Sequence, residues 1–167
     1  NEEKALLDTG GGLTKAAWFL KNEPFLIVNA DIVTSLNLAS LYSFHLNHSF
    51  LATLAVQNRS SSRQIIFNED NELSGWKNHQ TGEEIIARKW NKAIFYSFSG
   101  VHVISPEIFE LMPEEEIFPI MPFYISLASG KSIGAFDHTG DIWEDVGKRN
   151  AIEKAETLLP FISGIST

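Results

Sequence analysis

The sequence predicts an α/β protein, and three observations support that prediction. A short apolar run at 25–29 reads Phe-Leu-Ile-Val-Asn and has the continuous hydrophobicity of a buried strand. A segment with apolar residues at helical spacing follows at 38–47, and a second strand-like run follows at 51–57. Strand, helix and strand in this order form a βαβ unit, which is typical of a sheet covered by helices.

Three consecutive glycines precede the first apolar helical pattern. The helix is predicted to begin near Leu13, with Gly10-Gly11-Gly12 as its entry turn, and to end at 22–24. The strand that follows is predicted to be buried on both faces and to stop at Ala30, which places Asp31 just past its carboxyl end. Capping residues precede the second helix at 35–37.

Short strands and helices alternate after the βαβ unit. The predicted strands are 64–67, 73–76, 93–104, 133–137 and 141–145; the predicted helices begin at 105 and cover 119–129 and 148–159; a surface excursion covers 77–88. Gly100 interrupts the longest strand, which predicts a bulge or a close backbone approach. The 167 residues contain no repeat, linker or low-complexity segment, so they are predicted to form one domain.

The composition argues against several classes of function. The formal net charge of -8 disfavours a nucleic-acid backbone or an anionic membrane as the main partner, because both reward clustered Lys and Arg. There are no cysteines, so disulfides and thiolate metal sites are impossible, and a cytoplasmic location is expected. No stretch is apolar enough to span a bilayer, and the first residues lack the order of a signal peptide.

Candidate chemistry lies with two aspartates. Asp31 and Asp145 each follow a short apolar run, and ligands collect at the carboxyl ends of strands in open α/β sheets. Two such carboxylates can share one divalent cation that meets a polyphosphate. Taken singly, each aspartate is more simply interpreted as a turn former or a helix cap.

The other polar motifs carry weaker signals. The three glycines fit neither the dinucleotide-binding pattern, which needs glycine where Lys15 stands, nor the phosphate-loop pattern. His45 and His48 lie three residues apart without a third ligand nearby, which favours packing and surface roles over a metal site. The segment 59–63, three serines between two arginines, can bind an anion, but a solvated turn is the simpler interpretation.

Four segments taken together resemble the sugar-1-phosphate nucleotidyltransferase family. In chain order they read L-L-D-T-G-G-G-L-T-K-A, P-F-L-I-V-N-A-D, F-S-G-V-H-V-I-S-P-E-I-F and W-E-D-V-G-K. The resemblance covers nearly the whole chain and is greatest for the bacterial branch with N-acetylmuramate-1-phosphate uridylyltransferases and mannose-1-phosphate guanylyltransferase-like proteins. It implies a Rossmann-like, three-layer α/β/α nucleotide-diphospho-sugar transferase fold with a mixed, mostly parallel sheet.

The resemblance also implies a reaction, in which a nucleoside triphosphate and a sugar 1-phosphate give a nucleotide sugar and pyrophosphate. It implies that Asp31 and Asp145 are the catalytic residues and hold a Mg²⁺ ion between the reacting phosphates. The expected substrates are UTP or GTP with a sugar 1-phosphate, in the synthesis of cell wall or polysaccharide precursors. The remaining site residues that it implies are Gly10, Gly11 and Gly12 for the nucleotide, and Gly100 and Asn29 for the sugar.

The chain departs from the family pattern at its N-terminal end. Family members open with a strand, a glycine-rich phosphate loop with a catalytic arginine, and a Pro-Lys pair, none of which is present here. Residues 1–167 are therefore expected to be a single catalytic domain that lacks the phosphate-loop segment and is nearly inactive alone. A sheet edge left unpaired by the missing strands favours self-association.

Two other functions stay open at this level. A metal-dependent glycosyltransferase also uses an aspartate at a strand end, but it usually carries Asp-x-Asp, and 29–33 contains one aspartate only. A non-catalytic sensor would bind a nucleotide or a sugar phosphate without turning it over.

Overall fold

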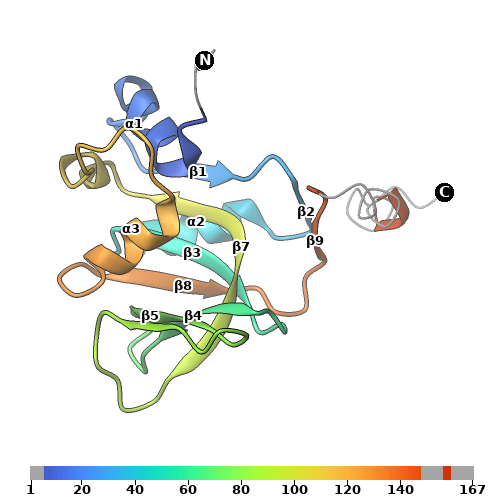
Figure 1. Cartoon of the computed structure of the whole chain (residues 1–167). Helices are drawn as coiled ribbons and strands as arrows, with labels where there is room; N and C mark the ends of the chain where they lie inside the picture. The colour runs from blue at the N-terminus through green and yellow to red at the C-terminus, as the bar shows by residue number, and fades with distance from the viewer. Residues whose placement is uncertain (1–5, 148–155, 159–167) are drawn as a thin grey trace.

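A computed structural model describes residues 6–147 and 156–158 of the chain (Figure 1). The helices are α1 (Asp8–Leu20), α2 (Leu38–Leu46), the 3₁₀ helix η1 (Pro106–Glu110) and α3 (Ile120–Leu127). The strands are β1 (Phe25–Val28), β2 (Ile32–Thr34), β3 (Ala52–Gln57), β4 (Arg63–Phe67), β5 (Leu73–Asn78), β6 (Glu84–Ile86), β7 (Ile94–Ile104), β8 (Ile133–Asp137) and β9 (Trp143–Asp145). The helix predicted at 148–159 lies outside the described residues except for 156–158, which are helical.

Strand β7 is the centre of the main sheet, whose order is β6-β5-β4-β7-β3-β8. Strands β1 and β4 both pair with the same side of β7, one after the other: Phe25 lies opposite Ile104, and Ile66 lies opposite Phe95. Strand β3 pairs with the other side of β7 from Ser97 to Ile104. The long strand β7, with which both β1 and β4 pair, therefore joins the β1 region to the β4–β6 region (Figure 1).

The sheet is mixed, as predicted, but its pairings are mostly antiparallel rather than mostly parallel. Among the described strands only β3 and β8 run parallel; the others pair antiparallel. Strand direction depends on how the connections cross the sheet, and the apolar pattern of a strand is the same in both directions. The prediction of a mostly parallel sheet was therefore wrong in that detail, whereas the α/β class is confirmed.

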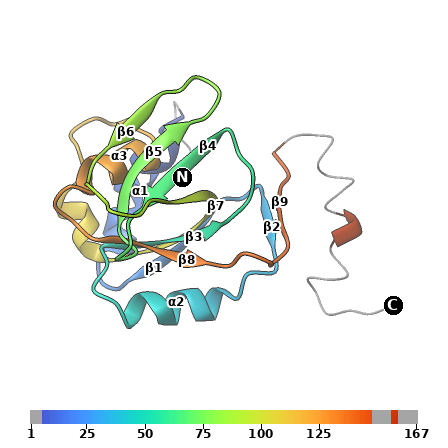
Figure 2. The ribbon, with the colours of Figure 1, turned by 90° about the horizontal axis from the view of Figure 1, so that it is seen from below.

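Helices cover both faces of the sheet and give the predicted three layers (Figure 2). On one face, Leu13 of α1 and Phe123 of α3 belong to the same buried cluster as Leu54 of β3. On the other face, Leu41 of α2 packs with Val103 of β7. Each layer buries its apolar side against the sheet, which is the main source of stability in such a domain. No helix in the described ranges is long and apolar enough to cross a membrane.

Local side-chain chemistry sets several element boundaries. The Asn37 side chain accepts a hydrogen bond from the Ser40 amide at 2.9 Å and begins α2, which confirms the predicted cap. In the β4–β5 turn, Asn68 Oδ1 accepts from the Glu72 amide at 2.8 Å, and Asn71 has a φ of +62°.

The glycine triplet is helical, so the predicted entry turn with a helix start at Leu13 is wrong. Helix α1 begins at Asp8, and the Gly10 amide donates to the Phe118 carbonyl at 3.0 Å. A Cβ on Gly10 would lie 2.2 Å from the Phe118 ring, and one on Gly11 would lie 2.0 Å from the Glu116 carbonyl oxygen. The two glycines let the segment 116–118 cross the helix closely, a contact between positions far apart in sequence.

Three further elements differ from the prediction. The surface excursion at 77–88 contains β6, which pairs with β5. Strand β1 is only half-buried, and Val28 is exposed. The helix after Ser105 is a 3₁₀ helix, and the Ser105 hydroxyl makes no cap but donates to the Phe50 carbonyl at 3.1 Å.

Candidate functional site

A short two-stranded sheet brings the two predicted aspartates together. Strand β2 pairs antiparallel with β9, so that Ile32 lies opposite Asp145, and the Val146 amide donates to the Asp31 carbonyl at 2.8 Å. The Gly147 amide donates to Asp145 Oδ1 at 2.9 Å. A Cβ on Gly147 would lie 2.9 Å from Asp31 Oδ2 and 3.1 Å from Asp145 Oδ1. One oxygen of each carboxylate therefore lies within 3.1 Å of the same point beside Gly147.

A partly buried hydrogen-bond network holds β9 in place beside the main sheet. The Thr34 hydroxyl donates to the Ile142 carbonyl at 2.8 Å, and the Trp143 indole donates to the Ser99 carbonyl at 2.8 Å. The ring of His138 bonds through Nε2 to the Ser99 hydroxyl at 2.8 Å, and burial lowers the pKa of His138. The Asp141 carboxylate, 3.4 Å from His138 Nδ1, acts in the opposite direction.

The carboxylate pair fits one hard divalent cation that is shared with a phosphate. Asp31 and Asp145 are both exposed, and ionised carboxylates offer only acceptor oxygens. Within the described ranges no group of three or more His, Asp or Glu residues could hold a metal ion. Mg²⁺ does not need such a group, because it usually binds one or two carboxylates and completes its shell with water and substrate phosphates.

The predicted sugar residues Asn29 and Gly100 lie next to each other, close to this pair. The Asn29 amide donates to the Gly100 carbonyl at 2.9 Å, and Gly100 has a φ of +73°. A Cβ on Gly100 would lie 2.9 Å from Ile32 Cγ1 and 3.0 Å from Asn29 Nδ2. The predicted close backbone approach is confirmed, and the register of β3 on β7 also shifts beside it, between Leu54 and Val56. Contact of these residues with a sugar stays a prediction.

The three glycines assigned to the nucleotide base do not form a loop. Gly10 and Gly11 are buried beneath 116–118, whereas nothing lies within 4 Å of the position of a Cβ on Gly12. Gly12 is thus the member of the triplet with room for a ligand. A role in base binding stays a prediction for these positions.

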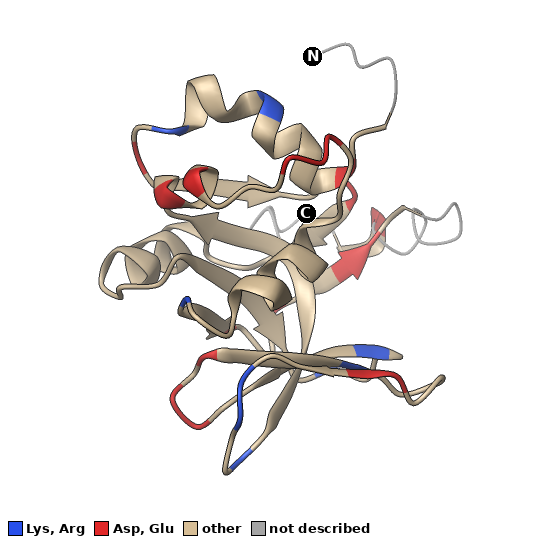
Figure 3. Ribbon diagram, turned by 60° about the vertical axis from the view of Figure 1, so that its left-hand side comes forward, with Lys and Arg blue, Asp and Glu red and all other residues tan. Residues whose placement is uncertain are grey.

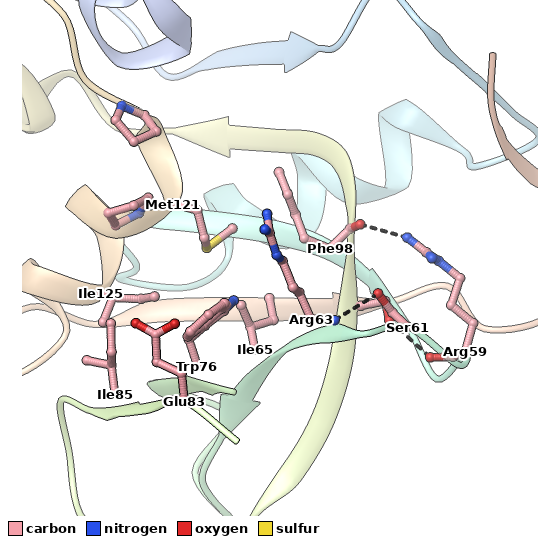
Figure 4. A pocket seen from close by; sticks show the side chains of 13 residues that line it. Arg59, Ser61, Arg63, Ile65, Trp76, Glu83, Ile85, Phe98, Met121 and Ile125 are labelled. Atoms are coloured by element: carbon pink, nitrogen blue, oxygen red, sulfur yellow. Dashed lines mark hydrogen bonds between the residues drawn. The ribbon is translucent and has the colours of Figure 1, made fainter. Parts of the chain in front are cut away.

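A cleft of about 540 Å³ opens between α3 and the β4–β6 strands (Figure 4). Its volume is within the usual range of small-molecule sites, roughly 300–1,000 Å³. Most of its lining is apolar or aromatic, and few charged side chains reach it. The lining residues are Arg59, Ser61, Arg63, Ile65, Trp76, Glu83, Ile85, Ser97, Phe98, Pro119, Met121, Pro122 and Ile125.

Arg59 connects this cleft to the carboxylate pair. Its guanidinium carbon lies 3.7 Å from the centroid of the Trp143 ring, and Nη2 donates to the Phe98 carbonyl at 3.0 Å. Burial lowers the pKa of Arg59, while the charges of Asp145 and Glu144 act in the opposite direction. The interpretation of 59–63 as a solvated turn missed this residue. Its position just after the end of buried β3 is the sequence signal that could have found it.

The fold defines a class of domain, since solved sugar-phosphate nucleotidyltransferases share the three-layer α/β/α arrangement. A solved inositol-1-phosphate CTP transferase from T. maritima shares this fold with a TM-score of 0.68 and 14% identity, covering 99% of this chain and 67% of that chain. No family model matches the sequence.

Two curated proteins are similar to this chain in sequence as well. The chain is 26% identical over 159 residues to the mannose-1-phosphate guanylyltransferase catalytic subunit beta of Drosophila pseudoobscura pseudoobscura, covering 89% of this chain and 38% of that protein. It is 25% identical over 156 residues to the N-acetylmuramate alpha-1-phosphate uridylyltransferase of Neisseria meningitidis serogroup B. That alignment covers 91% of this chain and 62% of the other protein. The chain is therefore related to the sugar-1-phosphate nucleotidyltransferases, and it spans less than two thirds of the length of either relative.

Proposed function

We propose that this chain supplies the metal site and the sugar-phosphate site of a sugar-1-phosphate nucleotidyltransferase that works in the cytoplasm with UTP or GTP. The observation that carries the proposal is the convergence of Asp31 and Asp145 on the space beside Gly147. A pair of carboxylates that Arg59 and Trp143 connect to a cleft of sugar size suits a reaction between two phosphates. The relationship to proteins with names of this kind supports the same conclusion.

The proposed reaction uses no protein nucleophile. A phosphate oxygen of the sugar 1-phosphate attacks the α-phosphorus of the nucleoside triphosphate, a new phosphorus–oxygen bond forms, and pyrophosphate leaves with the electrons of the broken bond. Asp31 and Asp145 would hold the Mg²⁺ ion, which neutralises phosphate charge when it is bound. Arg59 adds a fixed positive charge between the carboxylates and the cleft. The aromatic side chains of Trp76 and Phe98 offer faces against which a sugar ring packs.

Release of pyrophosphate tests this proposal. The protein that the complete gene encodes is incubated with MgCl₂, one of four nucleoside triphosphates and one of several sugar 1-phosphates, and pyrophosphate is measured. We expect release that requires both substrates and the metal ion. Binding of both substrates without release would favour a non-catalytic sensor, and release without a sugar 1-phosphate would point to a hydrolase.

We also propose self-association through the free edge of β1. Among the described strands β1 pairs with β7 alone, and an unpaired edge is a template for another strand. Val28, on this edge strand, is 42% exposed. Analytical ultracentrifugation at tens of micromolar should show a dimer, and Val28→Lys should shift the protein to monomer because edge lysines block strand pairing. Leu46→Lys on α2, an exposed apolar position away from the edge, serves as the control. A monomeric wild-type chain would contradict this proposal.

A further inference from the structure

Strand β9, which carries Asp145, has little support of its own. Among the described strands it pairs only with β2, and each of these two strands is three residues long. Figure 2 shows both of them beside the main sheet. A two-stranded sheet is at best marginally stable by itself. The place of Asp145 therefore depends on contacts between β9 and other elements.

A gap in the strand pairing of β7 provides such contacts. On the side that β4 and β1 share, β4 pairs with 94–96 and β1 pairs with 101–104, so no described strand covers 97–99 on that side. Two side chains bind carbonyls in this gap: Arg59 Nη2 donates to Phe98 at 3.0 Å, and the Trp143 indole donates to Ser99 at 2.8 Å. Carbonyls inside a protein need such partners. Trp143 thereby attaches β9 to the main sheet.

Arg59 lies on the Trp143 ring and is itself attached to the main sheet. Its guanidinium carbon is 3.7 Å from the ring centroid, which is the geometry of a cation–π contact. The Arg59 carbonyl accepts hydrogen bonds from the Ser97 hydroxyl at 3.0 Å and from the Gln64 side chain at 3.2 Å. The Nε atom of Arg59 is buried without a partner, which is unfavourable for folding. The arginine thus covers the ring although one of its own donors stays unsatisfied.

The ring and the carboxylate belong to one short strand. Trp143 and Asp145 are two residues apart in β9, so their side chains point to the same face of the strand. A displaced ring would move the carboxylate with the strand, and the ligand oxygens of a metal ion have to lie within about 0.2 Å of their ideal distances. We propose that Arg59 is a positioning residue, which holds Trp143 against β7 and so keeps Asp145 where it binds the metal ion; this role rests on the proposed function.

The charge of Arg59 alone would have the opposite effect on the metal ion. Neither β2 nor β9 contains a Lys or Arg residue, whereas β9 contains Glu144 and Asp145 (Figure 3). Burial lowers the pKa of Arg59 and the charge of Asp145 acts in the opposite direction, so the two groups interact electrostatically. A cation beside Asp145 repels a metal ion, so removing it would strengthen metal binding if Arg59 acted by charge alone. Loss of positioning would weaken metal binding instead.

Arg59→Lys separates position from charge, because lysine keeps the charge but lacks the planar group that lies on the ring. Mn²⁺ binding to the 167-residue chain is measured by water proton relaxation. We expect binding to weaken about tenfold, the low end of the effect of losing a group that orients a metal ligand. Arg59→Met should also weaken binding, although by less, because this variant removes the repulsion as well.

The Trp143 indole reports on the contact itself. The chain has four tryptophans, and in a ¹H–¹⁵N correlation spectrum the indole N–H signal of Trp143 is the one that Trp143→Phe lacks. In Arg59→Lys this signal should shift, because the guanidinium no longer lies over the ring. The signal of Trp18 on α1 should keep its position and report an intact fold. Trp143→Phe should also bind Mn²⁺ more weakly, because it loses the bond to Ser99.

Arg63→Lys is the matched control, since it makes the same exchange at an exposed position on β4. It should leave Mn²⁺ binding and the Trp143 signal unchanged. Unchanged or tighter Mn²⁺ binding in Arg59→Lys would overturn the positioning role while the proposed function stands. A fall in the turnover of that variant with normal Mn²⁺ binding would reassign Arg59 to the substrate. Absence of Mn²⁺ binding in the wild-type chain would count against the proposed function itself.

Discussion

Replacing Asp31 or Asp145 by asparagine is expected to lower metal-dependent nucleotidyl transfer about 100- to 1,000-fold or more. Both carboxylates reach the same space beside Gly147, so each contributes charge to one cation. Asparagine keeps the shape of the side chain but removes its negative charge, and a hard cation such as Mg²⁺ depends on that charge. The loss should therefore appear in turnover without a matching loss of fold.

Two measurements separate this effect from general damage. Initial rates of pyrophosphate release are compared for the wild-type protein and both variants across a MgCl₂ series, and Mn²⁺ binding to the isolated chain is followed by water proton relaxation. Asp70→Asn serves as the matched control, because Asp70 is exposed in the β4–β5 turn away from the site. Near-normal turnover of either site variant with Mg²⁺ would remove that aspartate from the metal site.

The second large effect is expected at Gly100, where substitution by alanine should lower the free energy of unfolding by about 2–4 kcal/mol. Part of the loss comes from the φ of +73°, a conformation that residues with a Cβ rarely adopt. The rest comes from crowding, because the new methyl group would lie 2.9 Å from Ile32 and 3.0 Å from the Asn29 amide nitrogen. Urea unfolding at 25 °C measures the change.

Gly82→Ala isolates the backbone contribution. Gly82 has a similar φ of +76°, but nothing lies within 4 Å of the position of its Cβ. This variant should therefore lose only about 1 kcal/mol. Equal losses for the two glycines would show that the approach of Asn29 and Ile32 to β7 is not tight. Because these two residues flank Asp31, the Gly100 variant should also bind Mn²⁺ more weakly than the Gly82 variant.

Local signals in the sequence predicted much of the fold. The strand at Ile133–Asp137 has the predicted bounds, because turn residues flank a continuous apolar run. Asn37 caps α2 as expected, and Gly100 marks a close approach. The strand bounds and the cap depend on a few neighbouring residues, whereas the glycine indicates only that some other segment passes close by.

The features that were missed depend on partners far along the chain. Gly10 and Gly11 of α1 lie against the segment 116–118, which passes too close for a Cβ. Strand β2 forms by pairing with β9. The direction of each strand in the sheet also depends on distant partners, because it is set by how the connections cross the sheet. For the site, the strand-end position indicated the two aspartates, but no local pattern showed that Arg59 lies over Trp143. An arginine next to a run of serines occurs both in solvated turns and in binding sites, so the local sequence does not distinguish the two.

The pairing of β2 with β9 has a consequence for biosynthesis. Residues 32–34 leave the ribosome early and 143–145 leave it late, yet the two segments must meet before Asp31 and Asp145 share one space. Strand β1 likewise waits for 101–104 on β7. Contacts between such distant segments slow folding, because the closure of long loops has to precede them. During translation the sheet of β3, β4, β5, β7 and β8 can therefore form before β9 meets β2, and a chain stopped before β9 would fold without the carboxylate pair.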